Sequence, residues 1–517
     1  MKKSVFILSF LLLFGLNVMG NTGSRIVLSL EYIEEKQDPN NAVDSFSRNF
    51  LSLLHEGLFR KNKNGEVVPG LVKNWKVSSD GLKWTFYLKD NIKWSNGDII
   101  TAEDFKRSWL RVLNPGKNFE WAFLLYPIKN AEKYNRGAVT ENQLGIKIIN
   151  SKTIEVELEK VIPYLPDILS RTFTVPVHKN FENQKDKYYS GAYIVKGFEN
   201  RDIVLEKNKD YWESTAVKIN TVVIKEIYDE DSKIRAFENK EIDITAISGE
   251  KVSGYKGTGL QTIPDGSVWY LTLNTKNKVL SNPKIRKSLQ IGINRDNLIR
   301  EAINGTGLKP FTFVPNNIGI KGISGDFSRE VTTKIPDYNK EEAKRLLSEG
   351  LKDLGITKMP SFTLIYNNSG NNEKVVKYIQ KNLKENLNID IKLSSVSFPE
   401  RIKRQKNRNF EIVFAGWSGD YNNPETYLNL FYSGSLNNSG SFSNAEYERL
   451  FKITESTVNN NERIKAFKEM ERIISQEIPV VTLFNRNSYY LVNPKIKGVG
   501  FASLENIILL REAEITR

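Results

Sequence analysis

The most informative stretch of the chain is Ile412-Val413-Phe414-Ala415-Gly416-Trp417-Ser418-Gly419-Asp420-Tyr421-Asn422-Asn423-Pro424. An apolar run typical of a buried strand enters a loop that holds glycines, aromatic rings, one carboxylate and two asparagines. Such a loop suits an extended ligand that carries both charges, because Gly416 permits close approach, main-chain groups can pair with an added strand, and Asp420 can bind an ammonium group. Trp417 and Tyr421 would supply apolar walls. A tight turn in which Asp420 caps a helix near Pro424 is the other interpretation.

The rest of the chain predicts a mixed α/β protein. Thr101 followed by Asp104 is close to a capping box, which marks the start of a helix. Alternating polar and apolar residues predict strands at 84–88, 153–158 and 268–273. Apolar residues spaced by three and four predict helices at 103–112, 284–293, 340–354, 373–387 and 462–474. We find neither a repeat of fixed period nor a linker-like composition that would mark domain boundaries.

Composition excludes several classes of protein. The chain has 517 residues, of which 26% are charged and 39% are hydrophobic. These fractions are typical of globular proteins, and neither a disordered chain nor a polytopic membrane protein has them. The length suggests about three domains. The sequence contains no cysteine, so disulfides, iron–sulfur clusters, thiol nucleophiles and lipid attachment through cysteine are excluded.

The positive net charge does not indicate a nucleic-acid partner. The formal charge is +14, yet no block of five like charges occurs and the lysines alternate with acidic residues and asparagines. Nucleic-acid binding proteins concentrate positive charge along one stripe with stacking aromatic side chains. A solvated, lysine-rich surface is therefore the favoured interpretation, and we expect no nucleic acid among the partners.

Residues 1–20 are typical of a secretory signal peptide. Lys2 and Lys3 precede an apolar run from Val5 to Leu16, and small or modest residues follow up to Gly20. The run is too short to span a bilayer, although an uncleaved anchor is the alternative. No cysteine follows it, which argues against a lipoprotein. We expect cleavage after Gly20, a mature charge of +12 (that is, +14 minus two lysines), and a soluble monomer in the periplasm.

Signatures of catalysis and metal binding are mostly missing. The sequence has no nucleophile elbow, phosphate loop or dinucleotide fingerprint. His55-Glu56 begins like a zinc-protease motif, but Phe59 stands where the second histidine belongs. The other histidine, His178, is 123 positions away, so a dedicated metal site is not expected. Adjacent carboxylates alone do not form an acid/base pair. We expect no enzyme, no metal and no cofactor.

Several further blocks carry a family resemblance. They are Leu54-His55-Glu56-Gly57-Leu58, Trp84-Thr85-Phe86, Trp94-Ser95-Asn96-Gly97-Asp98, Thr101-Ala102-Glu103-Asp104-Phe105, Gly191-Ala192-Tyr193, Asn208-Lys209-Asp210-Tyr211-Trp212, Lys240-Glu241-Ile242-Asp243 and Arg286-Lys287-Ser288-Leu289-Gln290 running to Ile293-Asn294-Arg295. Together with the Trp-x-x-Asp-Tyr-x-x-Pro segment at 417–424, their order resembles the extracytoplasmic solute-binding proteins of peptide ABC transporters. This is the oligopeptide- and dipeptide-binding family, solute-binding family 5.

The resemblance implies an α/β fold of the periplasmic-binding-protein type, with three domains and a ligand cleft between two lobes. The implied division is a discontinuous lobe I at 21–60, 181–268 and 488–517, an inserted domain II at 61–180, and lobe III at 269–487. The lobes would close about a hinge and enclose the ligand.

The resemblance also implies a set of ligand-binding residues. Asp420 would pair with the peptide α-ammonium, and Gly416, Trp417 and Ser418 would offer main-chain hydrogen bonds. From lobe I, Asp44, Ser45 and Phe46 would offer the opposing strand. Tyr421, Trp121, Trp269 and Phe398 would line pockets, although core packing is the alternative for the two tryptophans.

One departure from the family concerns the ligand carboxylate. Phe414 stands where enterobacterial oligopeptide binders carry an arginine. Arg171 and Arg486 are candidates to replace that arginine, and Arg404 is a third, for which a surface position is the preferred interpretation.

The resemblance therefore implies a binding protein that captures oligopeptides and delivers them to the membrane permease subunits of an ABC transporter. The alternative is the same fold with a non-peptide ligand, such as a nickel chelate, haem, an opine or a sugar, because fold does not fix the ligand.

Overall fold

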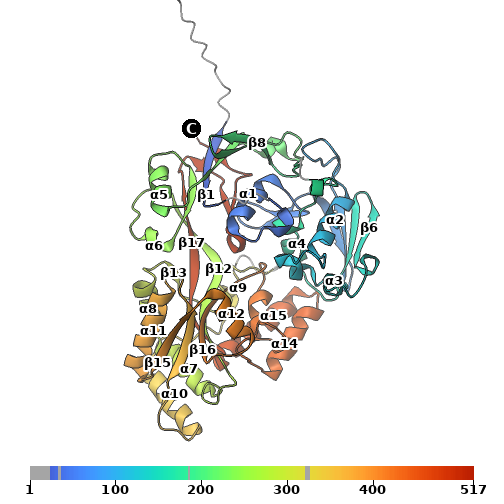
Figure 1. Ribbon diagram of the computed structural model, residues 1–517. Helices are drawn as coiled ribbons and strands as arrows, with labels where there is room; N and C mark the ends of the chain where they lie inside the picture. Colours follow the sequence, from blue (N-terminus) through green and yellow to red (C-terminus); the bar gives the residue numbers. More distant parts are fainter. Residues whose placement is uncertain (1–23, 33–36, 184–186, 321–325, 517) are drawn as a thin grey trace, which may run out of the picture.

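The computed structural model describes residues 24–32, 37–183, 187–320 and 326–516. Two lobes lie one above the other in Figure 1, and a smaller domain, domain II, lies beside the upper lobe. We call the upper lobe, which holds β1 and α1, lobe I, and the lower lobe, which holds α7 to α15, lobe III. Two long strands, β12 and β17, run from one lobe into the other.

An 11-stranded sheet extends through both lobes. Its long strands β12 (Leu260–Leu273) and β17 (Val480–Val492) are antiparallel neighbours in the middle of the strand order. On the lobe III side follow β16 (Ile412–Ser418), β14 (Phe362–Asn367) and β15 (Ile391–Val396). On the lobe I side follow β11 (Ile244–Ile247), β1 (Arg25–Leu30), β10 (Thr221–Glu226), β9 (Asp202–Lys207) and β8 (Tyr193–Glu199), while β13 (Gly307–Leu308) pairs with β17.

A wide bulge interrupts the pairing of β12 with β17 where the two strands pass between the lobes. Pro264 pairs with Asn487 and Val268 with Asn485, so residues 265–267 stand opposite Arg486 alone. The Asp265 carboxylate accepts hydrogen bonds from the Ser267 amide at 2.9 Å and from Arg486 Nε at 2.6 Å. Bulges bend a strand and increase its twist, so the strands change direction here.

Lobe I packs helices and short hairpins against its half of the sheet. Its core contains Ile26, Leu28, Phe50, Leu54 and Tyr193, all nearly inaccessible to solvent. The helices are α1 (Ser45–Leu54), α5 (Glu230–Glu238) and α6 (Gly249–Val252), and the hairpin strands are β18 (Ile496–Lys497), β21 (Glu514–Ile515), β19 (Gly500–Ala502) and β20 (Ile507–Leu509).

Domain II is built on a separate four-stranded sheet in the order β4-β5-β7-β6. Its helix α2 (Ala102–Val112) begins with the capping box between Thr101 and Asp104, and buries Phe105 and Trp109 against the sheet. The remaining elements are β4 (Val72–Val77), β5 (Lys83–Leu88), β7 (Thr153–Glu157), β6 (Ile146–Asn150), β2 (Phe59–Lys61), β3 (Val67–Pro69), α3 (Ala131–Asn135) and α4 (Leu165–Ile168).

Lobe III covers both faces of its half of the sheet, with one apolar core on each face. Phe414 belongs to one core and Val413 to the other, as the alternation of side chains along a strand requires. The helices are α7 (Pro283–Gly292), α8 (Arg295–Ala302), α9 (Phe327–Glu330), α10 (Lys340–Asp353), α11 (Asn372–Leu387), α12 (Phe398–Lys406), α13 (Glu425–Leu428), α14 (Ala445–Ser456) and α15 (Asn460–Glu477).

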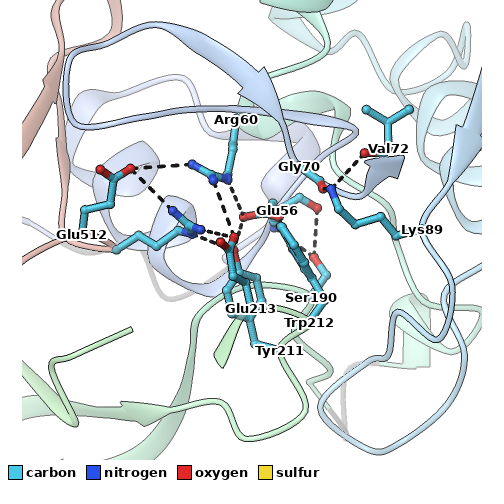
Figure 2. Close-up of polar contacts among 11 residues, drawn as sticks. Glu56, Arg60, Gly70, Val72, Lys89, Ser190, Tyr211, Trp212, Glu213 and Glu512 are labelled. Atoms are coloured by element: carbon cyan, nitrogen blue, oxygen red, sulfur yellow. Dashed lines mark hydrogen bonds and ion pairs between the residues drawn. The ribbon is translucent and has the colours of Figure 1, made fainter. Parts of the chain in front are cut away.

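A buried polar network lies where the chain passes from lobe I into domain II (Figure 2). The Glu56 carboxylate accepts hydrogen bonds from Tyr211 Oη at 2.5 Å and from Trp212 Nε1 at 2.6 Å. Arg60 approaches Glu56, Glu213 and Glu512 at 3.6–3.9 Å. Burial raises the pKa of Glu56, and Arg60 and the hydrogen bonds of the network oppose that rise. The network joins residues before domain II to residues far beyond it in the sequence.

The predicted α/β class, the two lobes and the inserted domain are confirmed, as are the helices and strands predicted from the spacing of apolar residues, although β12 begins at Leu260, well before the predicted strand at 268–273. The predicted boundaries at 268/269 and 487/488 fall inside β12 and β17, and the domain limits themselves stay a prediction. The predicted signal peptide, residues 1–20, lies outside the described residues. Among the residues that are described, no helix combines the length and apolar character needed to cross a bilayer.

Candidate functional site

A cavity of about 950 Å³ lies between the two lobes. Lobe I contributes the start of α1 and residues 246–250, and lobe III contributes the end of β16, the start of α11 and one face of α12. The volume is that of a site for a small molecule or a short peptide. Seven of the predicted ligand residues line it: Ser45, Phe46, Trp269, Phe398, Gly416, Ser418 and Arg486.

The end of β16 has one unpaired edge within this cavity. On one side β16 pairs with β12 along its whole length, from Ile412 to Ser418. On the other side its pairing with β14 is confined to Ile412 and Val413. The main chain of 414–418 therefore has no partner strand on that side among the described residues, although Gly416 and Ser418 face the cavity. An unpaired strand edge is a template for an extended peptide.

Gly416 is required by the close approach of a tryptophan ring. A Cβ atom at this position would lie 2.8 Å from Trp269 Cε2. Trp269 stacks on Phe484, with ring centroids 5.9 Å apart and an interplanar angle of 6°, and its ring also contacts Phe414. Phe414 is only 1% exposed. Phe414 therefore supports the cavity wall from behind and belongs to the core.

Trp417 points away from the cavity. Side chains alternate along β16, and Trp417 packs against the core on the opposite face of the sheet from Gly416 and Ser418. Its indole Nε1 is buried without a hydrogen-bond partner among the described residues. Its role in ligand binding stays a prediction, in which only its main chain would contact the ligand.

Asp420 lies just beyond the cavity-lining residues, in the loop that follows β16. Burial raises the pKa of its carboxyl group to about 6, and the Arg171 charge and a hydrogen bond with Thr426 oppose that rise. Asp420 does not cap the helix that follows, because Asn423 Oδ1 accepts the Glu425 amide at 3.1 Å. A buried carboxyl group with one weakly compensating cation suits an incoming ammonium group.

Domain II holds this loop in place. The ring of Tyr421 stacks on Tyr164, with centroids 4.0 Å apart and an angle of 5°. The Asn422 amide donates to Asp167 Oδ2 at 2.8 Å. Tyr421 thus packs against domain II and does not line the cavity between the lobes.

Arg171 and Trp121 lie at the same junction and outside the cavity. The Arg171 guanidinium donates to the Asp420 carbonyl, lies 3.5 Å from Glu505 and packs 5.2 Å from the Trp121 ring centroid. Trp121 Nε1 donates to the Ala42 carbonyl at 3.2 Å. Arg171 therefore already has a carboxylate partner, and both residues connect the domains around the Asp420 loop.

The prediction that Asp44, Ser45 and Phe46 form a strand is wrong. Asp44 is the N-cap of α1, and its carboxylate accepts the Ser47 amide at 2.8 Å. Ser45 and Phe46 form the first turn of this helix and line the cavity. A carboxylate that binds the third amide after it stabilises a helix start, and this local bond favours the helical conformation of Ser45 and Phe46.

The two other arginine candidates also have acidic partners. Arg486 Nε lies 2.6 Å from Asp265 in the bulge between β12 and β17, although Arg486 also lines the cavity. Arg404 pairs with Glu400 at 2.7 Å, outside the cavity-lining residues, which agrees with the surface position preferred for it.

Sequence reasoning missed Arg401. It lines the cavity, is 6% exposed, and forms part of α12 three residues after Phe398. The Arg401 guanidinium lies 5.0 Å from the Phe398 ring centroid. The sequence analysis predicts no helix at 398–406, and recognising that helix, which places residues three apart on one face, is what would have found Arg401.

Comparisons with known proteins identify relatives over most of the chain. Residues 66–439 match the family described as bacterial extracellular solute-binding proteins, family 5 Middle. The chain is 28% identical over 482 residues to the oligopeptide-binding protein OppA of Bacillus subtilis (strain 168), covering 89% of this chain and 87% of that protein. It is 30% identical over 502 residues to the periplasmic murein peptide-binding protein MppA of Escherichia coli (strain K12), covering 93% and 91%.

A solved structure has the same arrangement. The unliganded open form of the periplasmic murein tripeptide binding protein MppA superposes with a TM-score of 0.83 and 26% identity, covering 96% of this chain and 98% of that one.

Proposed function

The chain belongs to family 5 of the bacterial extracellular solute-binding proteins, and from that premise we propose that it binds oligopeptides outside the cytoplasm and delivers them to the permease subunits of an ABC importer. The proposal carries with it the predicted export through a cleaved signal peptide, the absence of a lipid anchor, and a monomer. Relatives named for binding oligopeptides and murein peptides support the ligand class.

The observation that carries the proposal is the unpaired edge of β16 in the cavity between the lobes. A peptide can add to this edge as a further strand, with its main chain bound at 414–418 and its side chains directed into the cavity. Main-chain pairing is indifferent to sequence, which suits a protein that accepts many peptides.

The Asp420 carboxyl group supports a fixed direction for the bound peptide. It follows β16 directly, so a strand added along 414–418 brings one end close to Asp420. A free α-ammonium group at that end restores the charged form of the carboxylate that burial disfavours.

The similarity to an unliganded open form supports binding by closure. A ligand in the cavity contacts both lobes only when they approach each other, and that difference in contacts shifts the population towards the closed form. The closed form is then the form that the permease would recognise.

Titration calorimetry with tetra-alanine and its singly N-methylated variants tests the proposal. In an added strand alternate amides face the partner, so methylation at every second amide should weaken binding about tenfold, the loss of one hydrogen bond, and methylation between them should have little effect. Losses of affinity that do not alternate along the peptide would contradict the proposal. It would also be contradicted if mass spectrometry of the purified protein detected a non-peptide compound as the only ligand.

A further inference from the structure

The cations that line the cavity differ in whether they have acidic partners. The cavity is lined by three cationic side chains, those of Lys233, Arg401 and Arg486. Lys233 Nζ pairs with Glu31 at 2.5 Å and Arg486 Nε with Asp265 at 2.6 Å. Arg401 has no carboxylate within 4 Å among the described residues. It is the one cavity cation in that part of the chain whose charge is left uncompensated.

Arg401 is also an exception among the buried arginines. Four other arginines in the described ranges are less than 9% exposed, and each pairs with a carboxylate at 2.8–3.5 Å: Arg171 with Glu505, Arg286 with Glu477, Arg295 with Asp337 and Arg463 with Glu425. A buried charge is costly unless it is paired. An arginine that is buried without a carboxylate therefore indicates a partner that arrives from outside the chain.

Neutral groups hold the Arg401 guanidinium in position. Nε donates to Asn367 Oδ1 at 2.9 Å and Nη1 donates to Gln405 Oε1, whereas Nη2 bonds to no described residue. The Phe398 ring, 57% exposed, covers one face of the guanidinium. These contacts fix the orientation of the planar group and leave its charge available, which is the arrangement that binds a carboxylate.

The start of α11 adds to the positive potential beside Arg401. Residues 369–372 line the same cavity, and α11 has 16 residues, so its N-terminus carries a substantial partial positive charge. The N-cap residue Asn371 makes no side-chain capping bond. The acidic residues that line the cavity, Glu31, Glu230 and Glu250, belong to lobe I, on the other side.

We propose that Arg401, beside the start of α11, binds a carboxylate of the peptide ligand, either the C-terminal group or an acidic side chain. The proposal rests on the proposed function and adds a specificity to it.

The test compares acidic and neutral peptides on matched variants of the full exported chain, freed of bound ligand. The probes are tetra-alanine against its C-terminal amide, and amidated tetra-alanine with Glu or Gln at each position in turn. In the wild type at least one acidic peptide should bind about 30-fold more tightly than its neutral counterpart. Arg401→Gln should reduce that preference to below about threefold. The pair that responds identifies whether the carboxylate is terminal or belongs to a side chain.

Arg404→Gln is the matched control, because it removes the same group from the same helix outside the cavity, and it should keep the full preference. Arg401→Lys should keep part of it, since a point charge remains, and it replaces Arg401→Gln if that variant fails to fold. If Arg401→Gln weakens the binding of acidic and neutral peptides equally, Arg401 acts in a contact between the lobes. That result would overturn the inference and leave the proposed function standing. A wild type that binds none of the peptides would overturn the proposed function as well.

Discussion

Asp420 shows how one buried carboxyl group can make peptide binding depend on pH. Its pKa is raised to about 6 by burial, so in the free protein it is protonated below that pH. A bound ammonium group lowers this pKa, and binding below pH 6 must therefore release the proton. We expect tetra-alanine to bind about tenfold more weakly at pH 5 than at pH 7, as measured by calorimetric titration.

The substitution Asp420→Asn separates this role from a structural one. It should weaken the binding of tetra-alanine by about 2–5 kcal/mol and remove the pH dependence of that binding. The binding of N-acetylated tetra-alanine should not change. Asp210→Asn, at an exposed acid paired with Lys93 at 3.9 Å, is the control. If the mutant and the wild type respond equally to pH and to acetylation, Asp420 does not bind the ammonium group.

The same residue shows what a sequence can predict about a site. Asp420 was identified because its motif is local, with strand, glycines and carboxylate adjacent in the chain. Its compensation by Arg171, which is 249 positions away, depends on how domain II packs and could not be predicted. The acidic partner of Arg486, Asp265, is 221 positions away, and Arg401 has no acidic partner among the described residues, so only the structure distinguishes the paired arginine from the unpaired one.

At the scale of elements, the ring of Trp269 on β12 lies so close to its register partner Gly416 on β16 that no Cβ atom fits between them. Gly416→Ala should force the ring from its stack on Phe484 and lower the free energy of unfolding by about 1–3 kcal/mol, the cost of overpacking. Gly254→Ala, where the added Cβ meets nothing closer than 3.8 Å, is the control. Urea unfolding of the two variants measures the difference. Equal unfolding midpoints would show that the cavity wall accommodates the added methyl group without loss of stability.

Helices and strands were predictable wherever the pattern of apolar residues is regular over several turns. The spacing in 340–354 and 373–387 predicted α10 and α11 closely. The wrong prediction of a strand at 44–46 has a local cause. A family resemblance matches residue types along the chain, and it does not show that the Asp44 carboxylate accepts the Ser47 amide. Asp44 followed by a hydroxyl residue and an amphipathic run was itself the signal for a helix start.

At the scale of the whole molecule, the Glu56 network in Figure 2 joins segments of the chain that lie on either side of domain II in the sequence. Glu56→Ala leaves Arg60 and Tyr211 without their buried partner, and should lower the free energy of unfolding by about 3–5 kcal/mol. Glu341→Ala, at a carboxylate that is 80% exposed, should change it little. Calorimetric scans test this, and an equal effect of both substitutions would mean that the network is dispensable.

Closure should be a motion of lobe III against lobe I. Small-angle scattering should show a smaller radius of gyration with saturating tetra-alanine, because only the closed form gives the ligand contacts with both lobes. An unchanged profile at saturation would count against a hinge between the lobes.

The bulge between β12 and β17 separates how tightly the protein binds from which peptides it prefers. The free energy needed to bend the two strands is added to the binding of every ligand alike, since the bulge residues 265–267 take the same strain whichever side chains fill the cavity. Gly266 has φ +67°, and a Cβ atom there would lie 2.2 Å from Leu504 Cδ2. Substitution at this glycine would therefore change the affinity for every peptide by the same factor and keep the order of preference among peptides. Evolution can in this way adjust the affinity to the supply of peptide without changing the specificity.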